Sequence, residues 1–241
     1  MPNPQTAVIT GAGTGVGRAV TLALASRNWN LALLGRTQRT LDETIRLAGT
    51  TSGKFIPIVC DVADERAVAS MAQTVCEQLR EPSVLVNSAG TNVPRRAFDV
   101  LSNEDYRAII DANLNGAFYC TQAFLPAMRQ AGRGTIVNVA SDAGLRANAF
   151  SGPAYVASKF GMVGLTQAVN AEERKHGVRA CVVCPGEIDT PILEKRPTIP
   201  DAATRAKMLQ PEDVAACVVL AIELPDRAIA EEIVVRPTAA R

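Results

Sequence analysis

Short aliphatic and β-branched runs alternate with longer segments of helical periodicity along the chain. The runs predict seven strands, over residues 6–10, 30–35, 55–60, 84–87, 135–139, 178–183 and 232–235. The helical patterns between them, of which the longest cover residues 102–132 and 153–175, predict crossover helices. Strands that alternate with helices are typical of an α/β fold. We therefore predict a doubly wound parallel sheet of about seven strands with helices on both faces, in a single domain.

One proline helps to order these strands. Pro57 lies inside the third run, and proline cannot donate a hydrogen bond to a neighbouring strand. We therefore expect this strand at an edge of the sheet. In the doubly wound order 3-2-1-4-5-6 the third strand is an edge strand, so the proline agrees with that topology.

A glycine-rich turn joins the first strand to the helix that follows it. Residues 11–17 carry four glycines, at alternate positions from Gly11 to Gly17. Glycines in this context let the backbone approach a pyrophosphate at the helix N-terminus. The strand, turn and helix together predict a dinucleotide-binding site.

The end of the second strand indicates which dinucleotide binds. Many NAD-binding sheets carry an acid there for the ribose 2′-hydroxyl, but this chain has Gly35 followed by Arg36. A guanidinium binds a 2′-phosphate that an acid would repel, so we expect NADP, with NAD less favoured. The alternative is a solvated arginine at the start of the next helix.

A tyrosine and a lysine lie four residues apart on the predicted helix over residues 153–175. This spacing places Tyr155 and Lys159 on one face, within reach of the same small molecule. A positive charge beside a phenol stabilises the phenolate, so we expect Lys159, together with a bound cationic nicotinamide, to lower the pKa of Tyr155 for acid-base catalysis. Taken alone, the pair could also lie by chance on a half-wet helix face.

Three other polar features are candidates for the site. Asp61 ends the third strand, at the sheet edge where ligands bind, although it could instead be an N-cap or a turn residue. Residues 111–116 are unusually polar for a helix interior, which indicates a functional role or a local kink. Residues 191–209 are charged and broken by prolines, and we predict a mobile lid.

Basic residues near the predicted lid are candidates for binding an anionic substrate, although such residues on a loop are usually only solvated. They are Lys195, Arg196, Arg205, Lys207 and, on the facing loop, Arg146. The lone histidine, His176, precedes a glycine near a helix end, so we interpret it as a helix-end cation.

Composition excludes several classes of protein. A chain of 241 residues suits one α/β domain, and a net charge of +1 with interspersed signs indicates neither a nucleic-acid nor a membrane partner. The six cysteines stand singly in apolar runs, and Cys181 and Cys184 should face opposite sides of one strand. We expect buried thiols in a reducing cytoplasm, and no metal site. The polar residues 1–5 predict no signal peptide, and no apolar run is long enough to span a bilayer.

These motifs together resemble the short, single-domain branch of the short-chain dehydrogenase/reductase family, over nearly the whole chain. The glycine motif of that family matches Thr10-Gly11-x-x-x-Gly15-x-Gly17, and its Asn-Asn-Ala-Gly stretch matches residues 87–90, with Ser88 in place of the second Asn. Its catalytic tetrad matches Asn113, Ser141, Tyr155 and Lys159. Its motif after strand six matches Pro185-Gly186 and Thr190.

The resemblance implies a Rossmann-like NAD(P)-binding domain over residues 1–241, with a lid or substrate loop at 191–209. It implies that Tyr155 is the acid-base, Ser141 orients the substrate carbonyl, Lys159 holds the ribose hydroxyls and Asn113 anchors a proton-relay water. The implied cofactor-binding residues are Gly11, Thr14, Gly15, Val16, Gly17, Arg36, Asp61, Val62, Asn87, Ala89, Gly90, Tyr155, Lys159, Pro185, Gly186, Ile188 and Thr190.

The activity so implied is NADP(H)-dependent interconversion of a carbonyl and a secondary alcohol. The tail at residues 233–238 lacks the family's frequent Gly-Gly and is similar to that of 3-hydroxy-acid dehydrogenases, so 3-oxoacyl and 3-hydroxy-acid compounds are candidate substrates. Family likeness also implies a homotetramer or homodimer, packed through residues 117–128 and 161–171. A non-catalytic NADP sensor is disfavoured because the tetrad is complete. A sugar-nucleotide epimerase or dehydratase is disfavoured because the chain is too short for a substrate domain.

Overall fold

Seven parallel strands form one sheet in the computed structural model, which describes residues 5–238. The strand order is β3-β2-β1-β4-β5-β6-β7. The strands are β1 (Thr6–Thr10), β2 (Asn30–Gly35), β3 (Phe55–Val59), β4 (Val84–Asn87), β5 (Gly134–Val139), β6 (Val178–Pro185) and β7 (Glu232–Val235). The doubly wound prediction is confirmed. Pro57 lies on the edge strand β3, as predicted, and pairs in register with Leu33.

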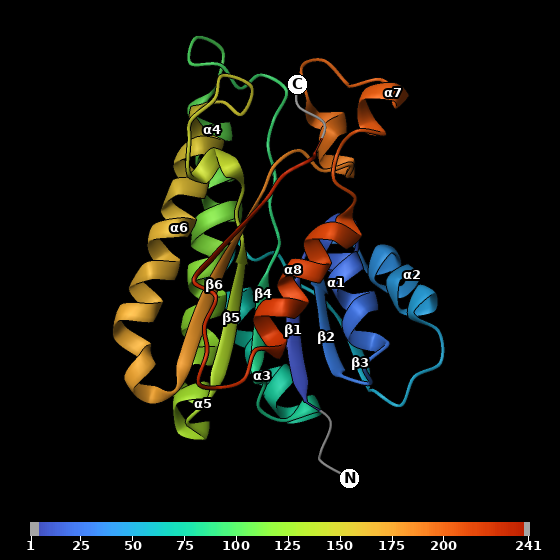
Figure 1. Ribbon diagram of the computed structural model, residues 1–241, viewed down its shortest axis with the longest axis vertical. Coiled ribbons are helices and arrows are strands. Elements are labelled where there is room, and N and C mark those ends of the chain that lie inside the picture. The colour runs from blue at the N-terminus through green and yellow to red at the C-terminus, as the bar shows by residue number, and fades with distance from the viewer. Residues whose placement is uncertain (1–4, 239–241) are drawn as a thin grey trace.

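Helices cover both faces of this sheet (Figure 1). They are α1 (Gly15–Ala25), α2 (Gln38–Ala48), α3 (Glu65–Leu79), α4 (Asn103–Ile110), α5 (Gly116–Ala131), α6 (Pro153–Glu173), α7 (Ala202–Arg205) and α8 (Pro211–Glu223). Side chains of α1, α2 and α8 pack on one face, and those of α3, α5 and α6 pack on the other. In Figure 1, α7 lies at the end of the molecule opposite the N-terminus.

Successive side chains of each strand point to opposite faces of the sheet, so each strand contributes to the apolar core on both faces. On β1, Ala7 and Ile9 join the cluster under α1 and α8, whereas Val8 joins the cluster under α3 and α5. A parallel sheet covered on both faces buries every position in this way, which explains why the strands are apolar throughout. Cys181 and Cys184 follow the same rule on β6 and point into different clusters, as predicted.

Polar side chains define where several helices begin. Asp64 accepts hydrogen bonds from the backbone amides of Arg66 and Ala67 at the start of α3, and Ser102 accepts one from Asp105 before α4. These N-caps satisfy amides that have no partner within the helix. Before α8, Gln210 and Asp213 form a reciprocal capping box.

The expectation that all thiols are buried needs refinement. All six cysteines are free, but Cys76 is exposed and Cys217 is half-buried, so not every thiol is a core residue. No helix within residues 5–238 is long and apolar enough to cross a bilayer. The polar start of the chain, residues 1–4, lies outside the described residues, as do residues 239–241.

Candidate active site

A cavity of about 690 Å³ opens at the carboxyl ends of the strands, where ligands of open α/β sheets bind. The turns after β1, β2, β4, β5, β6 and β7 all contribute to its wall. Most of the site residues expected from the sequence meet there. They are Gly11, Thr14, Gly15, Val16, Gly17, Arg36, Ala89, Gly90, Ser141, Tyr155, Lys159, Pro185, Gly186, Ile188 and Thr190.

The glycine turn forms one wall because no side chain fits at its tightest points. Gly11 has a φ of +66°, and a Cβ added there would lie 3.0 Å from the Cα of Ala89. A Cβ added at Gly17 would lie 2.3 Å from the carbonyl oxygen of Gly11. These contacts leave a bare backbone at the N-terminus of α1, which fits the cradle that a pyrophosphate requires.

Thr10 and Ser88 join the ends of β1 and β4 behind the glycine turn. The Oγ1 of Thr10 accepts hydrogen bonds from the backbone amides of Ser88 and Ala89, both at 3.0 Å. In the other direction, the Oγ of Ser88 donates to the carbonyl oxygen of Thr10 at 2.6 Å. The serine that departs from the family stretch therefore has a defined structural partner.

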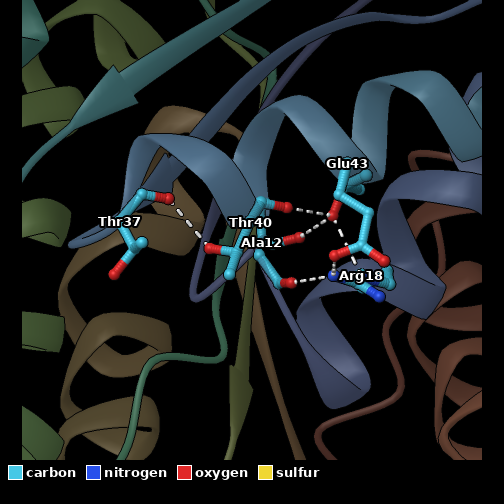
Figure 2. A network of polar contacts seen from close by, with 7 residues as sticks. Ala12, Arg18, Thr37, Thr40 and Glu43 are labelled. Carbon is cyan, nitrogen blue, oxygen red and sulfur yellow. Dashed lines mark hydrogen bonds and ion pairs between the residues drawn. The ribbon is translucent and has the colours of Figure 1, made fainter.

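A polar network fixes the glycine turn to α1 and α2 (Figure 2). Arg18 on α1 donates to the carbonyl oxygen of Gly13 at 2.6 Å and to the carboxylate of Glu43 on α2 at 3.1 Å. Arg18 also donates to Thr44, whose hydroxyl in turn donates to the carbonyl oxygen of Ala12 at 3.0 Å. The turn is thus held by side-chain contacts before any ligand binds.

Two cations lie near each other where the second strand ends. Arg36 is exposed, lines the cavity and forms no ion pair with any other residue of the described range 5–238. Partial burial lowers the pKa of Lys195, and the neighbouring charge of Arg36 lowers it further. An arginine without a carboxylate beside the dinucleotide cradle fits a phosphate group.

Tyr155 and Lys159 share one face of α6, as their spacing predicted. The Nζ of Lys159 lies 5.6 Å from the centre of the Tyr155 ring and donates to the carbonyl oxygen of Val139 at 3.0 Å. Burial of the ammonium group lowers the pKa of Lys159 to about 8. The lysine is therefore a fixed, desolvated cation between α6 and the end of β5.

The predicted direction of the Tyr155 shift is wrong for this structure. Burial raises the pKa of Tyr155, and a hydrogen bond from Ser141 only partly opposes that rise. The nearby charge of Asp142 raises the pKa of Tyr155 further, whereas those of Arg96 and Arg196 lower it. Desolvation disfavours the phenolate more strongly than the surrounding cations favour it. The sequence showed the neighbours of Tyr155 but not the desolvation of its phenol in the cavity.

Ser141 occupies the first turn after β5. Its Oγ accepts a hydrogen bond from the amide of Ala143 at 3.1 Å and lies 3.3 Å from Oδ1 of Asp142. A hydrogen bond also joins Ser141 to Tyr155. A hydroxyl held in this way beside the phenol can orient a carbonyl oxygen between the two groups.

The polar stretch within the predicted long helix is a π-helix, Asp111–Asn115, between α4 and α5. The suspected local irregularity is therefore present. Asn113 in this turn is fully buried, donates to Ser158 Oγ at 3.1 Å and forms two hydrogen bonds with the backbone of Thr91. Asn113 does not line the cavity. It holds Thr91, and Thr91 directly follows Gly90, which does line the cavity.

The structure places three expected cofactor residues outside the cavity wall. Asp61 accepts a hydrogen bond from the amide of Ala63 and is a turn residue, whereas Asp64 is the N-cap. Both Asp61 and Val62 follow the edge strand β3, and the turn after β3 does not contribute to the cavity wall. Asn87 is buried and donates to Asn138 at 2.9 Å, so its side chain braces β4 against β5.

The predicted lid is more structured than its sequence suggested. It contains a 3₁₀ turn at Pro191–Lys195 and helix α7, and it buries Leu193, Met208 and Leu209. The sequence offered no periodicity to reveal these contacts, because its few apolar residues are separated by charged residues and prolines and follow neither helical nor strand spacing. Mobility of the segment remains a prediction.

Acidic partners neutralise two of the basic residues expected to be solvated. Arg196 pairs with Glu187 at 2.8 Å, and Arg205 pairs with Asp189 at 2.6 Å. Both pairs join the lid to the turn after β6. Neither pair could be predicted from helical or strand spacing, because all four residues lie in irregular structure or at its border.

Sequence reasoning missed Arg96, which is buried and lines the cavity. In the sequence it stands next to Arg95 in a polar loop, where two arginines are typical of solvated surface. Only the folded chain distinguishes them, because Arg95 is exposed and Arg96 is not. Other cavity residues that gave no signal include Asn92, Asn148 and Ser151.

Comparison with known proteins agrees with this geometry. Residues 5–199 match the family model described as short chain dehydrogenase. The D-beta-hydroxybutyrate dehydrogenase of Rhizobium meliloti is 35% identical over 201 residues, which are 83% of this chain and 76% of that protein. The 3-oxoacyl-[acyl-carrier-protein] reductase FabG of Thermotoga maritima is 35% identical over 191 residues, 79% of this chain and 76% of that one.

A solved structure is similar along the whole chain. It is an alcohol dehydrogenase from the archaeon Thermococcus sibiricus, complexed with 5-hydroxy-NADP. The two chains superimpose with a TM-score of 0.86 at 27% identity, and the match covers 99% of each.

Proposed function

This chain belongs to the short-chain dehydrogenase family, whose members are oxidoreductases acting on CH–OH groups, and on that premise we propose that it is an NADP(H)-dependent enzyme that interconverts a carbonyl and a secondary alcohol. The observation that carries the proposal is the convergence of Tyr155, Ser141 and Lys159 in one cavity with the bare backbone of the glycine turn. A dinucleotide cradle and an acid-base group that share a cavity suit hydride transfer coupled to proton transfer.

Proton transfer falls to Tyr155 in this proposal. The nicotinamide, when bound, supplies or accepts the hydride. In the direction of reduction, the phenol of Tyr155 gives its proton to the carbonyl oxygen as the alcohol forms. A phenol has an ordinary pKa of about 10 and burial raises that of Tyr155, so it carries the proton that reduction requires. Ser141 orients the carbonyl oxygen beside the phenol. Lys159, whose Nζ is held against the carbonyl oxygen of Val139 at the end of β5, would bind the ribose hydroxyls.

We assign NADP(H) as the cofactor because of Arg36. The backbone of the glycine turn would hold the pyrophosphate, and Arg36 would bind the 2′-phosphate, with Lys195 contributing charge. The NADP derivative in the archaeal alcohol dehydrogenase supports this choice. Ile188 and Thr190, after β6, would contact the nicotinamide end.

The names of the two relatives guide the choice of substrates to test. One is a hydroxybutyrate dehydrogenase and the other a 3-oxoacyl reductase, so we propose 3-hydroxy acids and 3-oxoacyl compounds as the first candidates.

We also propose that the lid at residues 191–209 closes over the substrate. The expected compartment is the cytoplasm, which the free cysteines support.

We further propose a homotetramer or homodimer. Phe118 on α5 is 44% exposed and Phe160 on α6 is 45% exposed, within or beside the stretches 117–128 and 161–171. Exposed aromatic residues on neighbouring helices suit a subunit contact. Light scattering at micromolar concentration should give two or four times the chain mass of 25.5 kDa, and a monomeric mass would refute the assignment.

The test of the activity is a screen of NADPH oxidation with ketones, β-keto esters and 3-oxoacyl thioesters. Wild-type protein should oxidise NADPH with at least one class. The Tyr155→Phe variant should lose turnover by a factor of about 10³ or more while still binding NADPH, because only the ionisable oxygen is removed. Binding of NADPH without oxidation by any substrate would favour a cofactor sensor. Full activity in Tyr155→Phe would place the catalyst elsewhere.

A further inference from the structure

Arg96 is a buried cation at the substrate end of the cavity. Its residue is only 8% exposed, and it lines the same cavity as Tyr155 and Ser141. Arg96 also lies against Gly152, at the start of the helix that carries Tyr155, and its charge lowers the pKa of the Tyr155 phenol. Buried arginines are rare unless they are paired, so the surroundings of Arg96 need an explanation.

Backbone carbonyls occupy only part of the donor capacity of Arg96. Its Nε donates to Val93 at 2.8 Å, its Nη1 to Phe150 at 3.3 Å, and its Nη2 to the carbonyl oxygen of Lys195. A guanidinium has five N–H donors, so two remain after these three bonds. The carbonyls are neutral, and they do not compensate the positive charge.

Within residues 5–238, Arg96 forms no ion pair. Burial lowers the pKa of Arg96, and the nearby charge of Arg196 lowers it further. The start of α6 also lies against Arg96, because a Cβ added at Gly152 would approach its Cβ and Cγ to 2.8 and 3.0 Å. The N-terminus of a helix carries partial positive charge, so this end of the cavity concentrates positive charge.

We propose that Arg96 binds a carboxylate of the substrate and selects acidic substrates over neutral ones. This inference rests on the proposed oxidoreductase activity and specifies its substrate class. A carboxylate can accept the two remaining N–H donors of Arg96 and neutralise the buried charge. The closeness of Arg96 to Tyr155 means that the carboxylate lies near the reacting carbonyl. A phosphate at the far end of a long acyl carrier does not meet this condition.

The basic residues singled out from the sequence are less suited to this role. Arg196 and Arg205 already pair with acids, and Arg146 is exposed and does not line the cavity. The structure therefore moves the predicted anion contact from the lid to the loop after β4. Arg96 is buried, whereas none of the basic residues singled out from the sequence is, which makes the charge of Arg96 the least screened by solvent.

The test measures kcat/KM for three pairs of compounds, namely 2-oxo, 3-oxo and 4-oxo acids of equal length, each with its methyl ester. The readout is the ratio of acid to ester, which cancels differences in intrinsic reactivity when variants are compared. Arg96→Gln should lower this ratio by a factor of about 10 to 100 for the preferred acid, because a charge-assisted pair is lost. Arg96→Lys should lower it less, and through KM more than kcat.

Arg95→Gln is the matched control, because it makes the same change at the exposed neighbour, and its ratio should equal that of wild type. If Arg96 only ties loops together, Arg96→Gln will reduce activity with acid and ester alike, and the unchanged ratio will overturn the proposal. Wild-type turnover of esters without preference for any acid would also overturn it and would leave the oxidoreductase activity standing. Absence of NADPH oxidation with every compound would instead refute the proposed function.

Discussion

The two walls of the cavity are built in different ways. The cofactor wall comprises β1, α1, β2 and α2. The contacts of Arg18 and Thr44 that fix its glycine turn join residues no more than 32 apart in the sequence. The substrate wall comprises three loops, after β4, β5 and β6. Arg96 joins them through carbonyl groups 54 and 99 residues away in the sequence. One wall is largely a local supersecondary unit, with Thr10 and Ser88 as its long-range tie to β4, whereas the other exists only once the chain has folded.

This difference has a physical consequence. Tight backbone contacts in the glycine turn leave no room for change, so the cofactor wall constrains the residues that build it. In the substrate wall, side chains reach to carbonyl groups that any residue can offer, so the loops can vary around them. A common fold can therefore keep one cofactor site and change its substrates.

Gly17→Ala is the substitution that we expect to disturb the cofactor wall most. The new Cβ would lie 2.3 Å from the carbonyl oxygen of Gly11, so the backbone of the turn must move. We expect a loss of about 3 kcal/mol in the free energy of unfolding, together with loss of NADPH binding. Thermal unfolding and fluorescence titration measure these two effects.

Gly90→Ala is the matched control, because its Cβ would make ordinary contacts at 3.5 Å from Asn113 and 3.7 Å from Lys159. Its unfolding temperature should stay close to that of wild type. Equal stability of both variants would show that the turn adapts and that the cofactor wall is not rigid.

Lys159 lies where the two walls meet, and its buried charge should give stability a pH dependence. The pKa of Lys159 falls from 10.5 to about 8 on folding, so between these pH values the unfolded chain binds more protons than the folded protein. The free energy of unfolding of wild type should therefore rise, relative to Lys159→Met, as pH increases from about 8 to 10.5. The rise should approach about 3 kcal/mol, and the buried charge should cost most below pH 8.

The comparison with Lys159→Met is needed because other groups titrate in the same range. Burial raises the pKa of Cys120 and of Cys181 to about 12 in the folded protein. These thiols make wild type less stable above about pH 9, but they do so equally in the variant. Denaturant unfolding at several pH values gives the difference, and parallel curves would mean that Lys159 is already neutral or remains well hydrated.

Measuring cofactor preference tests the cofactor wall through a smaller and more selective effect. Arg36→Asp should lower the ratio of kcat/KM for NADPH over NADH by a factor of about 10 to 100, because a charge-assisted contact is replaced by repulsion. Arg39→Asp makes the same change one turn further along, outside the cavity, and should leave the ratio near that of wild type. An unchanged ratio in Arg36→Asp would remove Arg36 from the cofactor site.

The smallest expected effect is on trypsin cleavage of the lid, which belongs to the substrate wall. Trypsin should cut wild type after the exposed Lys207, whereas Arg196 precedes a proline and should resist cleavage. NADPH should slow the cut a few-fold, and a true substrate should slow it further, if ligands order the lid. Loss of the fragment in Lys207→Gln identifies the site. Equal rates with and without ligands would show that the lid does not close.

Sequence patterns predicted the elements of the fold well because each rests on local periodicity. They also singled out the glycine turn, Arg36, Tyr155 and Lys159, which all line the one cavity, because each is marked by residue type or spacing within one strand, turn or helix. Patterns could not reveal Arg96, because its burial depends on Phe150 and Lys195 from two other loops. They also gave the wrong sign for the pKa shift of Tyr155, because spacing shows neighbours but not desolvation.

The exchange of hydrogen bonds between Thr10 and Ser88 bears on how this sequence can evolve. Removing the threonine hydroxyl strands two backbone amides, and removing the serine hydroxyl strands the carbonyl oxygen of Thr10. Each single change is therefore costly, whereas a joint change can restore a complete set of partners. We expect the two positions to show epistasis, so that one residue limits which replacements the other accepts. A double-mutant cycle with Thr10→Val and Ser88→Ala, which remove the two hydroxyls, measures that coupling directly.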